Sequence, residues 1–269
     1  METYNNKVAI ITGGASGIGK ALGQHLLGQR AKVIVADLNI AEVNTGSGGF
    51  SQAHQVDVAQ ADQVQKLVDK VVAEYGRLDY MFNNAGFAIG GELRYTSLEN
   101  WDKIINVNLK GVIHGIAAAY PVMIQQGYGH IVNTASLAGL IPSPGLGAYS
   151  TTKHAVVGLS QCLRTEAAGL GVKVSVLCPG FIETNIFANA IAVGEDRATM
   201  RETIPFKFMQ ADHATRLMLE GIAKNQAIIT MPRYAYVSWG IYRLSPALLG
   251  LVNRLSLGNL RRANSAKSG

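Results

Sequence analysis

Cysteine is nearly absent from this chain, and its scarcity excludes two classes of protein. Only Cys162 and Cys178 occur in 269 residues, which is too few for a disulfide framework, and their spacing does not suit a metal site. We therefore expect both to be small buried hydrophobic residues in a protein of the reducing cytoplasm, with no metal bound.

Long apolar runs are absent as well. No stretch reaches the roughly 18 uninterrupted apolar residues that a membrane-spanning helix needs. Residues 1–6 are too few and too polar for a signal peptide, and the apolar run Val8–Ile11 follows directly. We expect no spanning helix, no cleaved leader and a cytoplasmic location.

Acidic residues are missing from the end of the chain. From residue 221 on there are seven cations and no Asp or Glu, whereas residues 1–220 hold 17 cations and 18 acids. The body therefore carries a net charge of −1, and the formal net charge of +6 belongs to the tail.

Short β-branched runs alternate with helical patterns, which is typical of a parallel sheet covered by helices on both faces. With 48% hydrophobic residues, the chain can bury the core of one α/β domain. We predict a doubly wound Rossmann-type parallel sheet of about seven strands. The predicted strands are Val8–Thr12, Lys32–Ala36, Ala53–Val56, Tyr80–Asn83, His130–Thr134, Lys173–Leu177 and Ala227–Thr230. The predicted helices include Ile18–Gly28, Ala61–Tyr75, Trp101–Gln125 and Ala148–Gly169.

Residues 1–232 are expected to form this single domain, and residues 233–269 a basic, apolar C-terminal extension. The segment 181–210 is too long for a routine connection between a strand and a helix. Insertions of this kind on α/β sheets often form substrate lids, and we predict one here.

A glycine-rich segment, Thr12–Gly19, joins the first predicted strand to the first helix. Backbone amides at a helix N-terminus are unpaired donors that can bind a pyrophosphate. Asp37 ends the second strand, where a carboxylate can bond a ribose 2′-hydroxyl and repel a 2′-phosphate, so we expect NAD rather than NADP. In the alternative interpretation, the segment is a plain strand-to-helix turn and Asp37 only caps the next turn.

Tyr149 and Lys153 lie four residues apart in a predicted helix, so their side chains share one face. A phenol ordinarily titrates near pH 10, and an adjacent ammonium favours its ionised form. Ser136 follows the strand His130–Thr134 at its carboxyl edge, where open parallel sheets bind ligands. Two oxygen donors aimed at a carbonyl suit hydride transfer to a ketone, and in reverse the phenolate is a base for an alcohol.

Taken together, these segments resemble the short-chain dehydrogenase/reductase family. The matching residues run in the family's order from residue 7 to about residue 185, and they are Thr12–Gly19, Asp57, Val58, Asn83–Gly86, Asn108, Ser136, Tyr149, Lys153, Pro179, Gly180 and Thr184.

The resemblance implies a nicotinamide cofactor and four catalytic residues. Ser136 would hold the substrate oxygen, Tyr149 would transfer the proton, and Asn108 would hold a water in a relay. Lys153 would bind the nicotinamide ribose and lower the pKa of Tyr149. The implied cofactor-binding residues are Gly13, Ser16, Gly17, Ile18, Gly19, Asp37, Asp57, Val58, Asn84, Ala85, Gly86, Tyr149, Lys153, Pro179, Gly180, Ile182 and Thr184.

The residues expected around the nicotinamide end are apolar, and no additional cation is placed there to bind a carboxylate or phosphate. We expect a hydrophobic secondary alcohol or ketone, of a lipid, steroid, retinoid or terpenoid kind, in a homodimer or homotetramer. The alternative is a non-catalytic dinucleotide-sensing module, which the presence of Ser136, Tyr149 and Lys153 disfavours. The apolar set is Phe87, Ile89, Leu137, Leu140, Ile141, Phe181, Ile186 and Phe187.

Aromatic, leucine and arginine side chains interleave over residues 233–262. Such a pattern suits a helix in a lipid interface, near anionic head groups. A subunit contact or a wall of the substrate pocket is an equal alternative. The leucine stripe argues against nucleic-acid binding.

Overall fold

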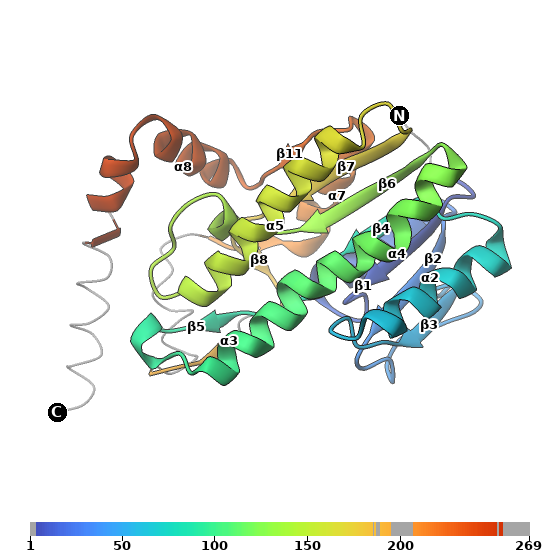
Figure 1. The fold of residues 1–269 in the computed structure, drawn as a ribbon, viewed down its shortest axis with the longest axis horizontal. Coiled ribbons are helices and arrows are strands. Elements are labelled where there is room, and N and C mark those ends of the chain that lie inside the picture. Colours follow the sequence, from blue (N-terminus) through green and yellow to red (C-terminus); the bar gives the residue numbers. More distant parts are fainter. Residues whose placement is uncertain (1–3, 185, 187–188, 195–206, 252, 255–269) are drawn as a thin grey trace.

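Seven parallel strands form one sheet in the order β11-β7-β6-β4-β1-β2-β3, with helices on both faces (Figure 1). The computed structural model describes residues 4–184, 186, 189–194, 207–251 and 253–254. The predicted Rossmann-type sheet is confirmed, and its strand order reverses between β1 and β4, where such sheets bind ligands. Its strands are β1 (Val8–Thr12), β2 (Lys32–Asp37), β3 (Gln52–Gln55), β4 (Tyr80–Asn83), β6 (Gly129–Thr134), β7 (Val172–Leu177) and β11 (Ile228–Ile229).

The side chains of β1 explain why the sheet is covered twice. Ala9 and Ile11 pack with α1 and α7 on one face, whereas Val8 and Ile10 pack with α2 and α4 on the other. Successive strand residues point to opposite faces, so an unbroken apolar strand needs two helical layers. The helices are α1 (Gly17–Gly28), α2 (Ala61–Tyr75), η1 (Leu93–Tyr95), α3 (Leu98–Ile105), α4 (Gly111–Gln126), η3 (Leu137–Gly139), α5 (Gly147–Glu166), α7 (Ala211–Ala223) and α8 (Arg233–Leu244).

The helix predicted for Trp101–Gln125 is longer than expected and contains a π-helical turn, η2 (Asn106–Lys110), between α3 and α4. By length and composition alone, the whole segment Leu98–Gln126 could cross a membrane. However, its own side chains Val112, Ala119 and Met123 are buried in the core clusters of the sheet domain. It is therefore a helix of the domain core.

Two short strand pairs that the sequence did not reveal involve described residues of the segment 181–210. β8 (Ile182–Glu183) pairs with β10 (Met209–Gln210), and β5 (Ile89–Gly90) pairs with β9 (Ile191–Ala192). Residues 185, 187–188 and 195–206 of the predicted lid lie outside the described residues.

One expectation about cysteine is wrong. Cys178 is buried as predicted, but Cys162 is exposed on α5. Its neighbours Val156, Val157 and Leu163 occupy the buried face of that helix, and Cys162 points away from them.

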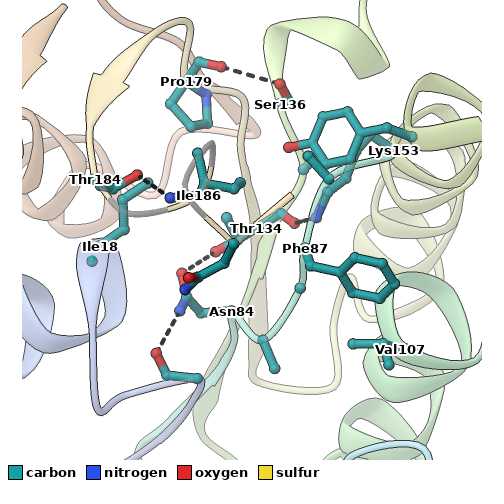
Figure 2. Close-up of a pocket in the computed structure, with 18 of the residues that line it drawn as sticks. Ile18, Asn84, Phe87, Val107, Thr134, Ser136, Lys153, Pro179, Thr184 and Ile186 are labelled. Atoms are coloured by element: carbon teal, nitrogen blue, oxygen red, sulfur yellow. Dashed lines mark hydrogen bonds between the residues drawn. The ribbon is translucent and has the colours of Figure 1, made fainter. Parts of the chain in front are cut away.

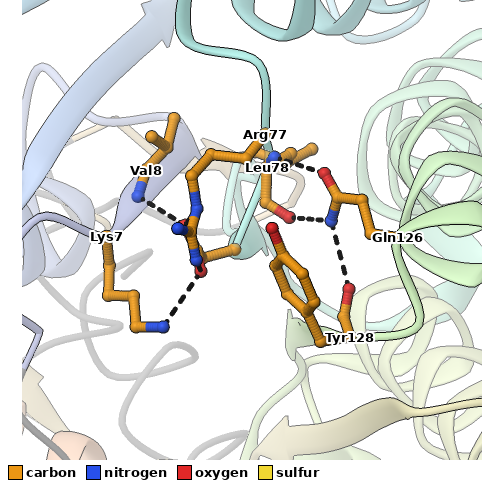
Figure 3. Close-up of polar contacts among 7 residues, drawn as sticks. Lys7, Val8, Arg77, Leu78, Gln126 and Tyr128 are labelled. Atoms are coloured by element: carbon orange, nitrogen blue, oxygen red, sulfur yellow. Dashed lines mark hydrogen bonds and ion pairs between the residues drawn. The ribbon is translucent and has the colours of Figure 1, made fainter.

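A buried carboxylate fastens the amino-terminal edge of the sheet (Figure 3). Asp79 is 4% exposed, and it accepts hydrogen bonds from the Val8 amide at 2.9 Å and from Arg77 Nε at 2.7 Å. Lys7 Nζ lies 3.3 Å from its other oxygen. This buried charge is fully paired, which is the usual condition for a structural one.

His130 lies in β6, and its side chain is buried in the sheet domain. Its Nε2 lies 2.9 Å from Ser175 Oγ, and within the described part of the chain its Nδ1 has no hydrogen-bond partner. Burial, helped by the charges of Lys173 and Arg164, lowers the pKa of His130 from 6.5 to about 3. The folded chain therefore keeps this imidazole neutral.

We predict that His130 makes the protein acid-sensitive. Below pH 6.5, His130 binds a proton in the unfolded chain, whereas in the folded chain it stays neutral down to a pH of about 3. The free energy of unfolding should therefore fall as the pH falls through this window, by up to about 1.4 kcal/mol per pH unit from this group. In urea titrations between about pH 6 and about pH 5, His130→Gln should show a shallower fall. The same change at the exposed His213 should not; equal slopes for both variants would contradict the prediction.

Candidate active site

A cavity of about 500 Å³ opens at the carboxyl edge of the sheet, over the ends of β1, β2, β4 and β6. It runs from Asp37 and Asp57 at one end to Ser136 and Tyr149 at the other. Almost every cofactor-binding residue predicted from the sequence lines it. These are Gly13, Ser16, Gly17, Ile18, Asp37, Asp57, Val58, Asn84, Ala85, Gly86, Tyr149, Lys153, Pro179, Gly180, Ile182 and Thr184. Gly19 and the predicted catalytic residue Asn108 do not line it, and both are buried.

The floor of the cavity is fixed by hydrogen bonds between the ends of β1 and β4. Figure 2 shows Asn84, whose side chain takes part in them. Thr12 Oγ1 accepts hydrogen bonds from the amides of Asn84 and Ala85, at 2.9 and 3.1 Å. The Asn84 side chain in turn donates to the carbonyls of Thr12 and Gly13, at 3.1 and 3.2 Å. Because these bonds cross between the two strands, the position of the glycine-rich turn is set by the core.

The glycine-rich turn needs its glycines for backbone geometry. Gly13 and Gly17 have φ of +64° and +53°, which other residues rarely adopt. A Cβ on Gly13 would also meet Ala85 Cα at 2.8 Å. The Asp37 carboxylate steadies the turn by accepting the Ala15 amide at 3.0 Å and also accepts the Asn39 amide at 3.3 Å. The capping role considered for Asp37 is thus present, and its side chain still borders the cavity.

Asn108 lies in the π-helical turn and is fully buried. Its side chain binds both polar groups of the Phe87 backbone, donating to the carbonyl at 2.9 Å and accepting the amide at 3.0 Å. π-turns inside α-helices are frequent at functional sites. Here the π-turn carries Asn108, which binds the backbone of Phe87, the residue that follows the segment Asn83–Gly86. The sequence did not indicate this clamp, and the implied water relay remains a prediction.

Ser136, Tyr149 and Lys153 meet at the far end of the cavity. Lys153 is 3% exposed, its Nζ donates to the Thr134 carbonyl at 2.8 Å, and it lies 5.6 Å from the centre of the Tyr149 ring. Ser136 Oγ donates to the Pro179 carbonyl at 3.4 Å and accepts the Ala138 amide at 3.2 Å. The serine is therefore held by the segment that follows β7 and by the first turn of η3.

Burial dominates the ionisation of this pair. It raises the pKa of Tyr149 to about 12, against a smaller opposite effect of a hydrogen bond with Ser136. It also lowers the pKa of Lys153 to about 8, so the ammonium is still mostly charged at neutral pH. The lowered pKa that the resemblance implied for Tyr149 is thus not what the chain by itself produces, because burial raises the pKa of Tyr149 by more than the hydrogen bond with Ser136 lowers it.

The apolar end of the cavity is only partly as predicted. Phe87, Leu137, Phe181 and Ile186 line it. Ile89, Leu140 and Ile141 are core residues, the alternative considered for some of this set, and Phe187 lies outside the described residues. Further lining residues that the sequence did not indicate include Ala88, Val107, Ala138, Ser143, Leu146 and Asn189.

Tyr234 of α8 is a further residue that the sequence did not reveal at this site. Its hydroxyl accepts the Phe181 amide at 2.6 Å, and the two rings stack with centroids 6.4 Å apart. A Cβ on Gly180 would lie 2.6 Å from that hydroxyl, so glycine permits the contact. The C-terminal extension thus holds the segment that borders the cavity after Pro179.

We predict that Tyr234→Phe loosens this segment. The lost hydrogen bond has a net value of about 1 kcal/mol, so backbone amides around Phe181 should exchange with solvent several-fold faster, on the order of 2- to 10-fold. Hydrogen-exchange mass spectrometry of the peptide that contains Phe181 measures this. Tyr236→Phe, on the exposed side of the same helix, is the control. Unchanged exchange in Tyr234→Phe would show that the bond does not hold the segment.

Comparison with known proteins agrees with this geometry. The chain is 36% identical over 242 residues to SadH of Mycobacterium tuberculosis, which is named as an oxidoreductase; the match covers 86% of this chain and 88% of SadH. It is 37% identical over 194 residues to a cyclohexanol dehydrogenase of an Acinetobacter species, covering 69% of this chain and 76% of that protein.

A solved structure is also similar. The crystal structure of a short chain dehydrogenase/reductase from Burkholderia phymatum in complex with NAD superimposes with a TM-score of 0.84 at 29% identity, covering 93% of this chain and 97% of that one. Residues 7–193 match the family described as short chain dehydrogenase. That range contains the glycine-rich turn and the Ser136, Tyr149 and Lys153 cluster, and the chain belongs to the short-chain dehydrogenase/reductase family of oxidoreductases.

Proposed function

We propose that this chain is an NAD-dependent oxidoreductase that transfers a hydride between nicotinamide and a hydrophobic secondary alcohol or ketone. The observation that carries the proposal is one cavity with Asp37 at one end and the cluster of Ser136, Tyr149 and Lys153 at the other. The residues along this cavity suit a dinucleotide, and the cluster at its far end suits proton transfer to an oxygen.

The residues around the cavity fit the parts of a dinucleotide. The turn around Gly13 and Gly17 offers backbone amides at the N-terminus of α1 to a pyrophosphate. The Asp37 carboxylate suits a ribose diol and disfavours a 2′-phosphate. When bound, NAD supplies the hydride acceptor and a positively charged ring. The NAD complex of the Burkholderia relative supports this choice of cofactor.

Proton transfer is assigned to Tyr149. In ketone reduction, its hydroxyl gives a proton to the substrate oxygen while the Ser136 hydroxyl holds that oxygen. In alcohol oxidation, the phenolate takes the proton back. The nearby Lys153 ammonium stabilises the phenolate, which burial otherwise disfavours.

An apolar substrate is supported by the lining of the cavity. Phe87, Leu137, Phe181 and Ile186 surround the cluster, and among the described lining residues Lys153 is the only basic one. A carboxylate or phosphate on the substrate would thus lose its hydration without gaining a second cation. The name of the Acinetobacter relative, cyclohexanol dehydrogenase, fits a substrate of this class.

We predict that Tyr149→Phe nearly abolishes turnover. The variant keeps the ring but removes the proton carrier, so kcat should fall by at least about 10²-fold, the lower range of general acid–base catalysis. The measurement is NAD reduction with a panel of alicyclic and other apolar secondary alcohols. The affinity for NAD should change little in the same variant. Wild-type turnover in Tyr149→Phe would remove this residue from the mechanism, and no turnover of any alcohol by the wild type would overturn the proposed substrate class.

We predict that Asp37 sets the choice of cofactor. Asp37→Asn removes the negative charge but keeps an oxygen that can accept the Ala15 amide, so it separates charge from loop geometry. The ratio of kcat/KM with NAD to that with NADP should be high in the wild type and much lower in Asp37→Asn. Asp62→Asn removes an exposed carboxylate of α2 and is the matched control. A wild type that prefers NADP would contradict the assignment.

A further inference from the structure

The outer side of the C-terminal extension carries an apolar row that nothing in the catalytic site explains. Val237, Ile241 and Leu244 follow one another at helical spacing on α8, and all three are exposed. Leu244, the last residue of α8, is 90% exposed. A single exposed leucine is ordinary, but exposed apolar side chains that gather in one patch mark an interaction site. The chain leaves the helical conformation at Ser245, and residues 246–251 are helical again and expose Leu248 and Leu251. These two side chains and the three of α8 are together called the apolar row.

The other side of the described part of the extension packs against the sheet domain, so the apolar row lies on the side that is left exposed. Tyr234, Trp239, Tyr242 and Leu249 contact a core cluster that includes Leu137, Leu140 and Ile141. The side chain of Asn253 donates to the Pro142 carbonyl at 3.0 Å. Figure 1 shows α8 (red) standing out from the layers of the sheet domain. The described part of the extension, residues 233–251 and 253–254, is called the arm, and it has one covered and one exposed face.

This arm adjoins the substrate end of the cavity. The segment around Leu137 and Ala138 lines the cavity, and the neighbouring residues to Pro142 receive the arm. Tyr234, at the start of α8, holds Phe181 on the opposite border. Whatever covers the apolar row will therefore lie near the end of the cavity assigned to the substrate.

The charges around the row favour an anionic partner. Arg233, Arg243 and Arg254 are the charged residues of segment 233–254, and no Asp or Glu occurs from residue 221 to the end of the chain. Arg243 lies over the Trp239 ring, 5.5 Å from its centre, at the edge of the row. A second copy of this chain would bring like charges together on this surface, whereas anionic lipid head groups would neutralise them.

We propose that the apolar row of Val237, Ile241, Leu244, Leu248 and Leu251 docks on an anionic membrane surface. The leucines enter the boundary between head groups and acyl chains, and the arginines remain at the level of the head groups. The arm thereby brings the substrate end of the cavity close to the lipid. That this gives an apolar alcohol a direct route into the cavity rests on the proposed function; the docking itself does not.

Co-sedimentation with vesicles tests the docking. At low salt, the full chain should sediment with vesicles of phosphatidylcholine and phosphatidylglycerol, and high salt should weaken the binding by screening the charges. Leu244→Gln/Leu248→Gln should reduce binding more than tenfold, because two buried apolar side chains are lost. The control is Leu98→Gln/Leu170→Gln, which changes two exposed leucines on other elements and should bind as the wild type does.

A second pair of variants tests the charges without altering the apolar row. Arg243→Gln/Arg254→Gln should weaken binding to the anionic vesicles by roughly fivefold for each arginine, and should not affect the weak binding to pure phosphatidylcholine. These variants keep the proposal testable if the leucine variants fold poorly.

Three results would overturn the proposal. The first is a wild type that does not bind anionic vesicles at low salt, and the second is equal binding by both leucine pairs. The third is a wild type that forms an oligomer, seen by light scattering, and does not bind vesicles, while Leu244→Gln/Leu248→Gln dissociates the oligomer. This result would assign the apolar row to contact with a second copy. Vesicle binding without turnover of any alcohol would instead contradict the proposed function and leave the docking in place.

Discussion

The site depends on one buried charge, the ammonium of Lys153, held at the carboxyl edge of the sheet. It is 3% exposed and donates to the Thr134 carbonyl at 2.8 Å, and among the described residues no carboxylate is paired with it. Burial of a cation without a counter-charge is costly and lowers its pKa. Such a group is retained where an anion develops beside it, and the Tyr149 phenolate is that anion in the proposed reaction.

The opposite edge of the sheet shows what a structural charge looks like in the same fold. Asp79 is as deeply buried as Lys153, but it is bonded to Arg77, Lys7 and the Val8 amide. Its pairing fastens β1 to the chain before β4 and leaves no charge available for chemistry. The contrast between a paired and an unpaired buried charge supports the assignment of function to the carboxyl edge.

Sequence patterns predicted those parts of the molecule that depend on local chemistry. The apolar run Val8–Thr12 could only be a strand covered on both faces, and the glycines after it required a turn into a helix. The spacing of Tyr149 and Lys153 placed both on one helix face. Contacts between distant segments could not be read in this way. The bond from Phe181 to Tyr234, the pairing of β5 with β9, and the π-turn that carries Asn108 all depend on how the chain packs in three dimensions. The ionisation of Tyr149 also escaped prediction, because the depth of burial decides it.

The most direct test of this account is the titration of Tyr149 in the enzyme saturated with NAD. Carbon-13 NMR of tyrosine labelled at Cζ reports ionisation of each phenol, and Tyr149→Phe assigns the resonance among the ten tyrosines. The account predicts a Tyr149 pKa below the ordinary value of 10.0, and a higher pKa when Lys153→Met removes the ammonium. A Tyr149 pKa that stays above 10.0, or one that Lys153→Met leaves unchanged, would contradict it.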